Sequence, residues 1–260
     1  MWCHGQMLSM EKFSLEKVLS VHTWTDTLFS FTLTRPVQFK FTAGQFARIG
    51  LMVGDELVVR AYSVVSSPFD ETLEYFSIVV PDGAFTSNLQ HLKVGDTLYL
   101  DKTSYGYLTL ARYQQPLPQD LWLLATGTGL APFLSMLQDF ATWQSYQHIN
   151  LVYSVRSATE LAYLERIQEI AASFGEGHSG FKFIPIIPRD PSAALHDRLP
   201  ILIANGELEQ AAGMLLSPAT SHVMLCGNPQ MVEDTKEALK LRGLIMNRRG
   251  VGNIAVENYW

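Results

Sequence analysis

The first part of the chain alternates short apolar runs with turn signals such as Arg35-Pro36 and Val94-Gly95-Asp96. β-Branched and aromatic residues dominate the runs, and helical periodicity is confined to residues 86–92. Short strands at this spacing predict a closed or nearly closed antiparallel β-barrel of Greek-key type. The predicted strands are residues 18–21, 28–33, 46–49, 58–64, 75–80 and 97–100.

After residue 112 the pattern changes to continuous apolar runs, most of them followed by helical stretches. This alternation predicts βαβ units in a doubly wound parallel sheet that is buried on both faces. Pro116-Leu117-Pro118 is a plausible linker, so we expect a barrel domain at residues 12–112 and an α/β domain at residues 113–260. The predicted strands are residues 121–125, 149–153, 181–187, 199–204 and 222–225, and the predicted helices are residues 132–143, 159–174 and 229–242.

Composition narrows the function classes. The chain has 260 residues and a formal net charge of −6, which disfavours a general nucleic-acid binder. Its two cysteines suit a reducing cytoplasm, and they are too few for an iron–sulfur cluster, which needs about four such ligands. The most apolar stretch, residues 121–137, is interrupted by glycines and a proline, so no membrane span is expected. The histidines lack metal-ligand spacing, so no metal site is expected either. We also expect a monomer.

A glycine-rich loop follows the first strand of the α/β part. Thr126-Gly127-Thr128-Gly129 leads to Pro132 at the start of a helix. Glycines here let the backbone approach a pyrophosphate at the helix N-terminus. A tight strand-to-helix turn without ligand would use the same residues, and Pro132 stands where the dinucleotide fingerprint has its third glycine.

Arginines follow the ends of the next predicted strands. An NAD-specific site of this kind usually has an acidic residue after its second strand, whereas this strand continues into Ser154-Val155-Arg156. Arg189 follows the third strand, and Arg198 precedes the next one. Each could be a solvated surface residue, but three at strand ends favour a site for a 2′-phosphate and therefore NADP.

The predicted barrel strand Arg60-Ala61-Tyr62-Ser63 combines a cation, a flat aromatic ring and a hydroxyl. Arg60 and Tyr62 would point to one face of the strand and Ser63 to the other. An arginine can hold a diphosphate while a tyrosine two residues further on stacks against a flat ring. Alone, the segment could equally be an ordinary barrel strand.

The motifs occur in a characteristic order: Arg60-Ala61-Tyr62-Ser63, then Pro81-Asp82-Gly83, then the glycine loop, then Cys226-Gly227-Asn228-Pro229. This series resembles the ferredoxin–NADP reductase superfamily, specifically the bacterial ferredoxin/flavodoxin–NADP reductases, from about residue 12 to the end. The resemblance implies an FAD enzyme that exchanges electrons between NADPH and ferredoxin or flavodoxin, by hydride transfer at flavin N5.

The resemblance also implies roles for individual residues. FAD would be held by Arg60 (diphosphate), Ala61, Tyr62 (stacked on the isoalloxazine), Ser63 (near N5), and Phe85, Thr86 and Ser87 (phosphates). NADP would be held by Thr126, Gly127, Thr128, Gly129, Pro132 and Gly227, with Arg156, Arg189 and Arg198 at its 2′-phosphate. Catalytic roles would fall to Ser63, Cys226 and Glu257; Cys226 would face the nicotinamide, although a small buried apolar role is the commoner one for a cysteine.

The C-terminus ends in Glu257-Asn258-Tyr259-Trp260. In the family a terminal tyrosine can cover the flavin face that the nicotinamide must reach, with a carboxylate two residues before it. Glu257 and Tyr259 match that pattern, and Trp260 is one residue beyond it. Whether Tyr259 or Trp260 covers the flavin or the adenine stays open.

Two alternatives remain: an NAD(P)H-dependent flavin or oxygenase reductase on the same scaffold, and a non-catalytic flavin-binding subunit. An acidic carrier protein could dock by electrostatic steering on a basic segment near the C-terminus, although such a run is often only a solvated face. Its basic residues are Lys236, Lys240, Arg242, Arg248 and Arg249.

Overall fold

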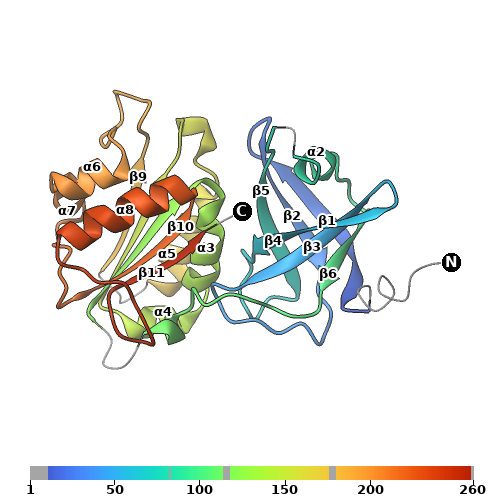
Figure 1. The fold of residues 1–260 in the computed structure, drawn as a ribbon, viewed down its shortest axis with the longest axis horizontal. Coiled ribbons are helices and arrows are strands. Elements are labelled where there is room, and N and C mark those ends of the chain that lie inside the picture. The colour runs from blue at the N-terminus through green and yellow to red at the C-terminus, as the bar shows by residue number, and fades with distance from the viewer. Residues whose placement is uncertain (1–10, 82, 114–117, 176–179, 259–260) are drawn as a thin grey trace.

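The computed structural model describes residues 11–81, 83–113, 118–175 and 180–258. Two sheets lie side by side, an antiparallel one built from the first part of the chain and a parallel one built from the second (Figure 1). The antiparallel strands are β1 Phe13–Thr23, β2 Leu28–Thr34, β3 Phe46–Val53, β4 Glu56–Ser63, β5 Thr72–Ile78 and β6 Thr97–Asp101, and the short helix α2 Thr86–Leu89 follows β5.

The antiparallel sheet has the order β4-β3-β6-β1-β2-β5. Its neighbours β3–β6 and β6–β1 are far apart in sequence, which is the mark of Greek-key connections. An isolated bridge between Val64, just after β4, and Tyr75 of β5 joins the two edges of the sheet, so that it curls nearly closed. Fully buried side chains such as Phe31, Leu33 and Ile49 fill the interior. The predicted barrel architecture is confirmed.

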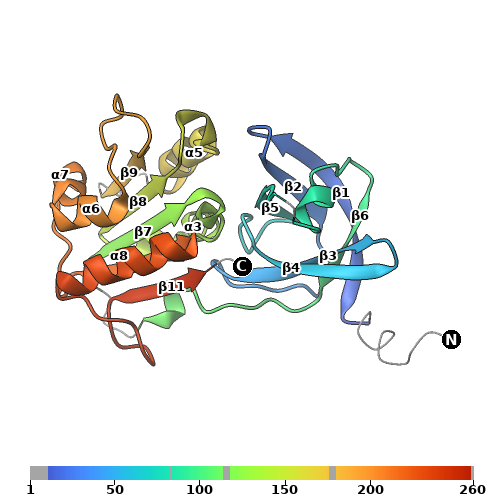
Figure 2. The ribbon, with the colours of Figure 1, turned by 45° about the horizontal axis from the view of Figure 1, so that its top comes forward.

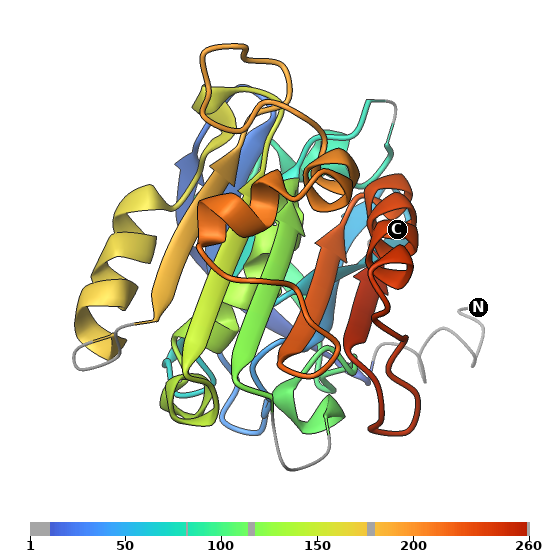
Figure 3. The same ribbon diagram turned by 90° about the vertical axis from the view of Figure 1, so that its left-hand side faces the viewer.

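The parallel sheet has the order β11-β10-β7-β8-β9 (Figure 3). Leu121 and Leu123 of β7 pack into one core cluster with α3 and α5, while Trp122 and Leu124 pack into another with α6 and α8. Successive residues of a strand point to opposite faces, so both faces are covered and the doubly wound prediction is confirmed. The elements are β7 Asp120–Thr126, α3 Ala131–Leu137, α4 Phe140–Ser145, β8 His148–Ser154, α5 Leu164–Phe174, β9 Phe181–Ile186, α6 Leu199–Ala204, α7 Glu207–Ala212, β10 Ser221–Gly227, α8 Pro229–Leu241 and β11 Ile254–Asn258.

Three local predictions are wrong. The predicted helix 132–143 is two helices, because Asp139 starts α4 by accepting the N–H of Ala141. The predicted strand 199–204 is helix α6, whose first turn contains Pro200, a favourable helix-starting residue. The predicted helix 159–174 begins only at Leu164, after Tyr163 in the left-handed region (φ 63°).

Hydrogen bonds between the two halves hold them in one arrangement. Ser135 Oγ on α3 donates to the carbonyl of Ser66 (2.7 Å), and this bond is buried. Tyr163 OH donates to Glu74 Oε1 of β5 (2.7 Å). Buried polar bonds of this kind fix a relative orientation because breaking them leaves unsatisfied groups. Within the described part of the chain, none of the helices has the length and apolar character needed to cross a membrane.

Candidate active site

A pocket of about 790 Å³ opens between the barrel and the carboxyl ends of the parallel strands. Ligands bind at this edge of open α/β sheets. The end of β4 and the segment at α2 form the barrel side of the pocket, and the loops after β7, β8, β9 and β10 form the other. Predicted site residues that line it are Arg60, Ala61, Tyr62, Ser63, Phe85, Thr86, Thr126, Gly127, Thr128, Arg156, Arg189, Arg198 and Gly227.

Tyr62 and Ser63 form the polar part of the barrel wall. The OH of Tyr62 lies 3.0 Å from Ser77 Oγ on β5, and burial raises the pKa of Tyr62 to about 12, so it is a neutral phenol. Ser63 is buried, and its Oγ has no hydrogen-bond partner among the described residues. Strand alternation predicted that Ser63 would point to the face opposite Arg60. Both residues nevertheless line the pocket, because Ser63 is the last residue of β4 and the pocket lies at that end of the strand.

Residues just before and within α2 complete the barrel side. The buried ring of Phe85 packs against Tyr62, with their centroids 5.9 Å apart. Thr86 Oγ1 accepts the N–H of Val80 (2.9 Å), which ties the start of α2 to the end of β5. Ser87, also predicted as a phosphate ligand, is absent from the pocket lining.

The glycine loop has the geometry of close backbone approach. Gly127 has φ +51° and open space where a side chain would be. Gly129 packs on β10 so tightly that an added Cβ would lie 2.2 Å from the carbonyl oxygen of Cys226. Gly227 has φ +136°, and the N–H of Asn228 donates to Thr126 Oγ1 (3.0 Å). The loop therefore exposes Gly127 to the pocket and uses Gly129 for packing.

Two predicted residues of this half lie behind the pocket lining. Pro132 is buried in the first turn of α3, where its missing N–H leaves no bond unmade. Cys226 is fully buried at the end of β10, and Gly227 and Asn228 present the adjoining backbone to the pocket.

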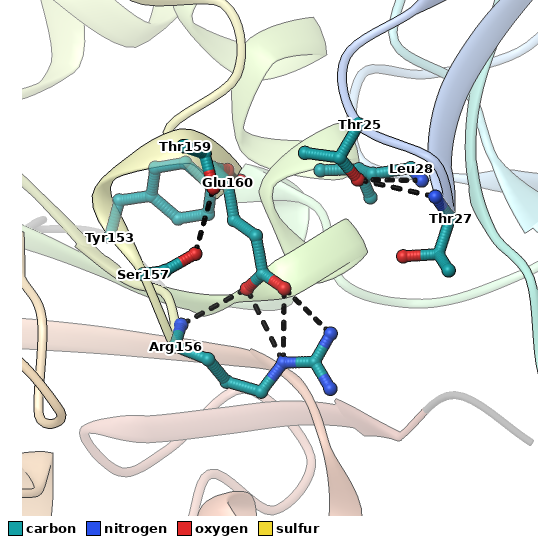
Figure 4. Close-up of polar contacts among 8 residues, drawn as sticks. All are labelled: Thr25, Thr27, Leu28, Tyr153, Arg156, Ser157, Thr159 and Glu160. Atoms are coloured by element: carbon teal, nitrogen blue, oxygen red, sulfur yellow. Dashed lines mark hydrogen bonds and ion pairs between the residues drawn. The ribbon is translucent and has the colours of Figure 1, made fainter.

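All three predicted arginines line the pocket, and two of them pair with acidic residues. Arg198 Nη2 lies 3.3 Å from Asp234 Oδ2. Arg156 Nη2 lies 2.6 Å from Glu160 Oε1, and the hydrogen bond to Glu160 raises the pKa of the Arg156 guanidinium (Figure 4). Among the described residues, Arg189 forms no ion pair. Glu160 itself lines the pocket and was missed from the sequence.

Glu257 lies on the edge strand β11, away from the pocket lining. Its carboxylate is mostly buried and packs close to Gly106, and Oε2 has no hydrogen-bond partner in the described part of the chain. Burial raises the pKa of Glu257 to about 7, against the opposing effect of Arg112. β11 points toward the barrel (Figure 2). Tyr259 and Trp260 lie outside the described residues.

The basic segment lies away from the pocket. Arg248 and Arg249 belong to the connection between α8 and β11, at the end of the sheet where the strands begin (Figure 3). The other three basic residues form ion pairs within the chain: Lys236 with Glu233, Lys240 with Glu237 and Arg242 with Glu209. Most of the segment's charge is therefore balanced locally.

Comparison with known proteins identifies the class. Residues 13–108 match the family model of an oxidoreductase FAD-binding domain, and residues 123–237 match that of an oxidoreductase NAD-binding domain. A crystal structure of a ferredoxin NADP⁺ reductase from Neisseria gonorrhoeae with bound FAD and NADP superimposes with a TM-score of 0.88, at 38% identity over 95% of this chain and 98% of that one. The protein is thus an oxidoreductase of the two-domain flavin and nicotinamide-nucleotide class.

The curated relatives narrow this class. A flavodoxin/ferredoxin–NADP reductase of Shigella flexneri is 42% identical over 94% of this chain and 97% of its own length. A ferredoxin–NADP reductase of Pseudomonas aeruginosa is 41% identical over 92% of this chain and 94% of its own length. The chain belongs to the flavodoxin/ferredoxin–NADP reductase family. The resemblance inferred from the motifs, the fold class and the enzyme class are confirmed.

Proposed function

We propose that this protein exchanges electrons between NADPH and ferredoxin or flavodoxin, with FAD bound in the described pocket. The observation that supports this most strongly is the pocket itself. It brings together Arg60-Ala61-Tyr62-Ser63 from the barrel, the glycine loop, and the three arginines at the ends of the parallel strands. A flavin and a nicotinamide nucleotide must meet for hydride transfer, and a pocket shared by both sheets allows this.

The barrel side of the pocket suits FAD. The buried Oγ of Ser63 finds no hydrogen-bond partner in the part of the chain that the structure describes, and a flavin edge would supply one. Tyr62 is held between Ser77 and Phe85, so its ring is fixed for stacking. Arg60 is exposed, lines the pocket and is the proposed diphosphate ligand. Phe85 and Thr86 are proposed at the phosphates, and Ser87, which lies next to them outside the pocket lining, is the third proposed ligand. FAD held by these residues would supply hydride acceptance from NADPH and the onward transfer of single electrons.

The parallel-sheet side suits NADPH. Thr126, Gly127 and Thr128 offer hydroxyls and open backbone for a diphosphate. Gly129 and Pro132 act by packing, since both lie behind the loop surface. Arg156, Arg189 and Arg198 are the proposed 2′-phosphate ligands. Gly227 packs against Thr126, and its backbone beside Cys226 is proposed to face the nicotinamide.

Glu257 and the two terminal aromatic residues complete the proposal. Glu257 holds a proton near neutral pH because burial raises its pKa to about 7, which suits a group that gives or takes a proton. Tyr259 and Trp260 are proposed to cover the flavin face or the adenine. The division into domains at residues 12–112 and 113–260, a monomeric state and a cytoplasmic location also belong to this proposal.

The carrier is proposed to dock on the basic segment, with the exposed Arg248 as a main point of attraction, because Lys236, Lys240 and Arg242 have acidic partners within the chain. Arg248 is exposed, and Arg248→Glu should raise the KM for the carrier most strongly at low ionic strength. Since the connection that carries Arg248 lies at the opposite end of the sheet from the pocket, an unchanged KM would place docking elsewhere.

The proposed function is tested by mixing the FAD-loaded protein with NADPH and either flavodoxin or ferredoxin without oxygen, and following the carrier's own spectrum. Reduction that requires both NADPH and the protein supports the proposal. If NADPH reduces the flavin and neither carrier receives electrons, the carrier assignment is wrong. An Arg156→Ala, Arg189→Ala double variant should keep FAD and lose NADPH affinity; unchanged affinity would remove the 2′-phosphate site.

A further inference from the structure

An acidic side chain, Glu160, lines the pocket beside the end of the second strand of the parallel-sheet half. In dinucleotide-binding sheets, an acidic residue near the end of the second strand accepts a hydrogen bond from the ribose 2′-hydroxyl. Here β8 ends at Ser154 and runs directly into Arg156, without an acid. The chain then turns through Ala158–Glu160 and brings the carboxylate of Glu160 back beside Arg156 (Figure 4).

Glu160 takes up the hydrogen-bond donors of Arg156. Oε1 accepts from Nη2 (2.6 Å) and Nε (3.1 Å) of the guanidinium, and Oε2 accepts the backbone N–H of Arg156 (3.1 Å). A guanidinium fork together with a backbone N–H is a donor set that also suits a phosphate monoester. The Glu160 carboxylate therefore occupies the donors of Arg156 that a phosphate group would use.

The backbone of Glu160 is anchored, so its carboxylate cannot simply move away with its loop. Tyr153 OH donates to the carbonyl of Glu160 (3.2 Å), and the N–H of Glu160 donates to the carbonyl of Ser157 (3.0 Å). Three residues further on, Tyr163 bonds to Glu74 of the barrel. The side chains of Glu160 and Arg156 are the parts that can rotate, and both line the pocket that a phosphate would share.

We propose that Glu160 is a specificity-determining residue that competes with the 2′-phosphate of NADPH for Arg156. The inference rests on the proposed function, since it requires that Arg156 bind that phosphate. A nucleotide with a 2′-phosphate must detach Arg156 from Glu160 and bind beside a second negative charge, so Glu160 weakens its binding. A nucleotide with a 2′-hydroxyl leaves the pair intact, and Glu160 can accept its hydrogen bond. Glu160 thus narrows the preference for NADPH over NADH.

The test is calorimetric titration of the purified FAD-loaded protein with 2′,5′-ADP and with 5′-AMP, which differ in the 2′-phosphate. Glu160→Gln keeps the size of the side chain and removes its charge. It should tighten 2′,5′-ADP about threefold to tenfold, the range expected for releasing a partly exposed ion pair beside a phosphate, and should leave 5′-AMP unchanged or weaker. Glu165→Gln, an exposed acid on α5 outside the pocket lining, is the matched control and should change neither.

The outcomes separate the possible failures. If Glu160 instead orients Arg156 for the phosphate, Glu160→Gln would weaken 2′,5′-ADP, and the inference would be overturned. The same substitution in an Arg156→Ala background should give little tightening, and full tightening there would refute competition for Arg156. If the wild-type protein does not distinguish 2′,5′-ADP from 5′-AMP, the 2′-phosphate site fails, and this inference fails with it.

Discussion

Ser63 and Ser77 lie in the same pocket, and their substitution by alanine should have opposite effects on the flavin-free protein. Both side chains are buried, but Ser77 Oγ lies 3.0 Å from the OH of Tyr62, while Ser63 Oγ lacks a partner among the described residues. A buried hydroxyl without a partner costs about 1–3 kcal/mol, and a satisfied one contributes about 1 kcal/mol. The two serines therefore form a matched pair.

The magnitude follows from these contacts. Ser63→Ala removes an unsatisfied group at the loss of a few van der Waals contacts, so the free energy of unfolding should rise by about 1 kcal/mol. Ser77→Ala leaves the OH of Tyr62 without its partner and should lower the free energy of unfolding by about 1–2 kcal/mol. Urea unfolding of the two flavin-free variants beside the wild type measures both values.

In the FAD-loaded protein, Ser63→Ala should impair flavin reduction, although it stabilises the flavin-free protein. If Ser63 donates a hydrogen bond to the flavin edge, its removal should slow flavin reduction by NADPH about tenfold or more. Stopped-flow absorbance at saturating NADPH measures this rate. Destabilisation of the flavin-free protein by Ser63→Ala, or an unchanged rate of flavin reduction, would refute the reasoning.

Three further predictions concern packing and buried titratable groups. Gly129→Ala places a Cβ 2.2 Å from the carbonyl oxygen of Cys226 and should destabilise the protein by at least about 3 kcal/mol in urea unfolding. Burial lowers the pKa of His222 to about 4, so the unfolded chain binds this proton more readily, and stability should fall as the pH drops from about 6.5 to 4. His222→Phe should abolish most of that loss, about 3 kcal/mol for a pKa shift of this size, and an unaltered urea midpoint profile would contradict the assignment. Burial raises the pKa of Glu257 to about 7, so its contribution is present below about pH 4.5 and is lost as the pH rises through 7. Glu257→Gln should flatten this decline between pH 5 and 8, and a decline as steep as in the wild type would show that other groups cause it.

The architecture was predictable because its signals are local. Strand alternation and the change to strand–helix alternation after residue 112 depend only on neighbouring residues. The break between α3 and α4 had a local signal that the periodicity concealed, since Asp139 caps α4 by accepting the N–H of Ala141. The apolar run 199–204 is too short for its period to separate strand from helix. β11 was missed because its strand conformation depends on parallel pairing with β10, which is not apparent from its own residues.

The candidate site was predictable only where a motif carried it. Arg60-Ala61-Tyr62-Ser63 and the glycine loop are contiguous segments, so the sequence displays them. Ser77, which holds Tyr62, lies on a different strand and gave no signal. Glu160 did give a signal in the sequence. It is an acidic residue four positions after an arginine at a strand end, and a single turn of the chain brings two residues at this spacing together.

Electron transfer from NADPH to FAD in the described pocket is most directly tested by anaerobic titration of the FAD-loaded protein with NADPH and, separately, with NADH, while the visible flavin band is recorded. NADPH should bleach the band at lower concentration and faster than NADH. Equal bleaching by NADH would contradict the role of the three arginines. A folded protein that carries no flavin and takes up none from added FAD would contradict the assignment of the pocket itself.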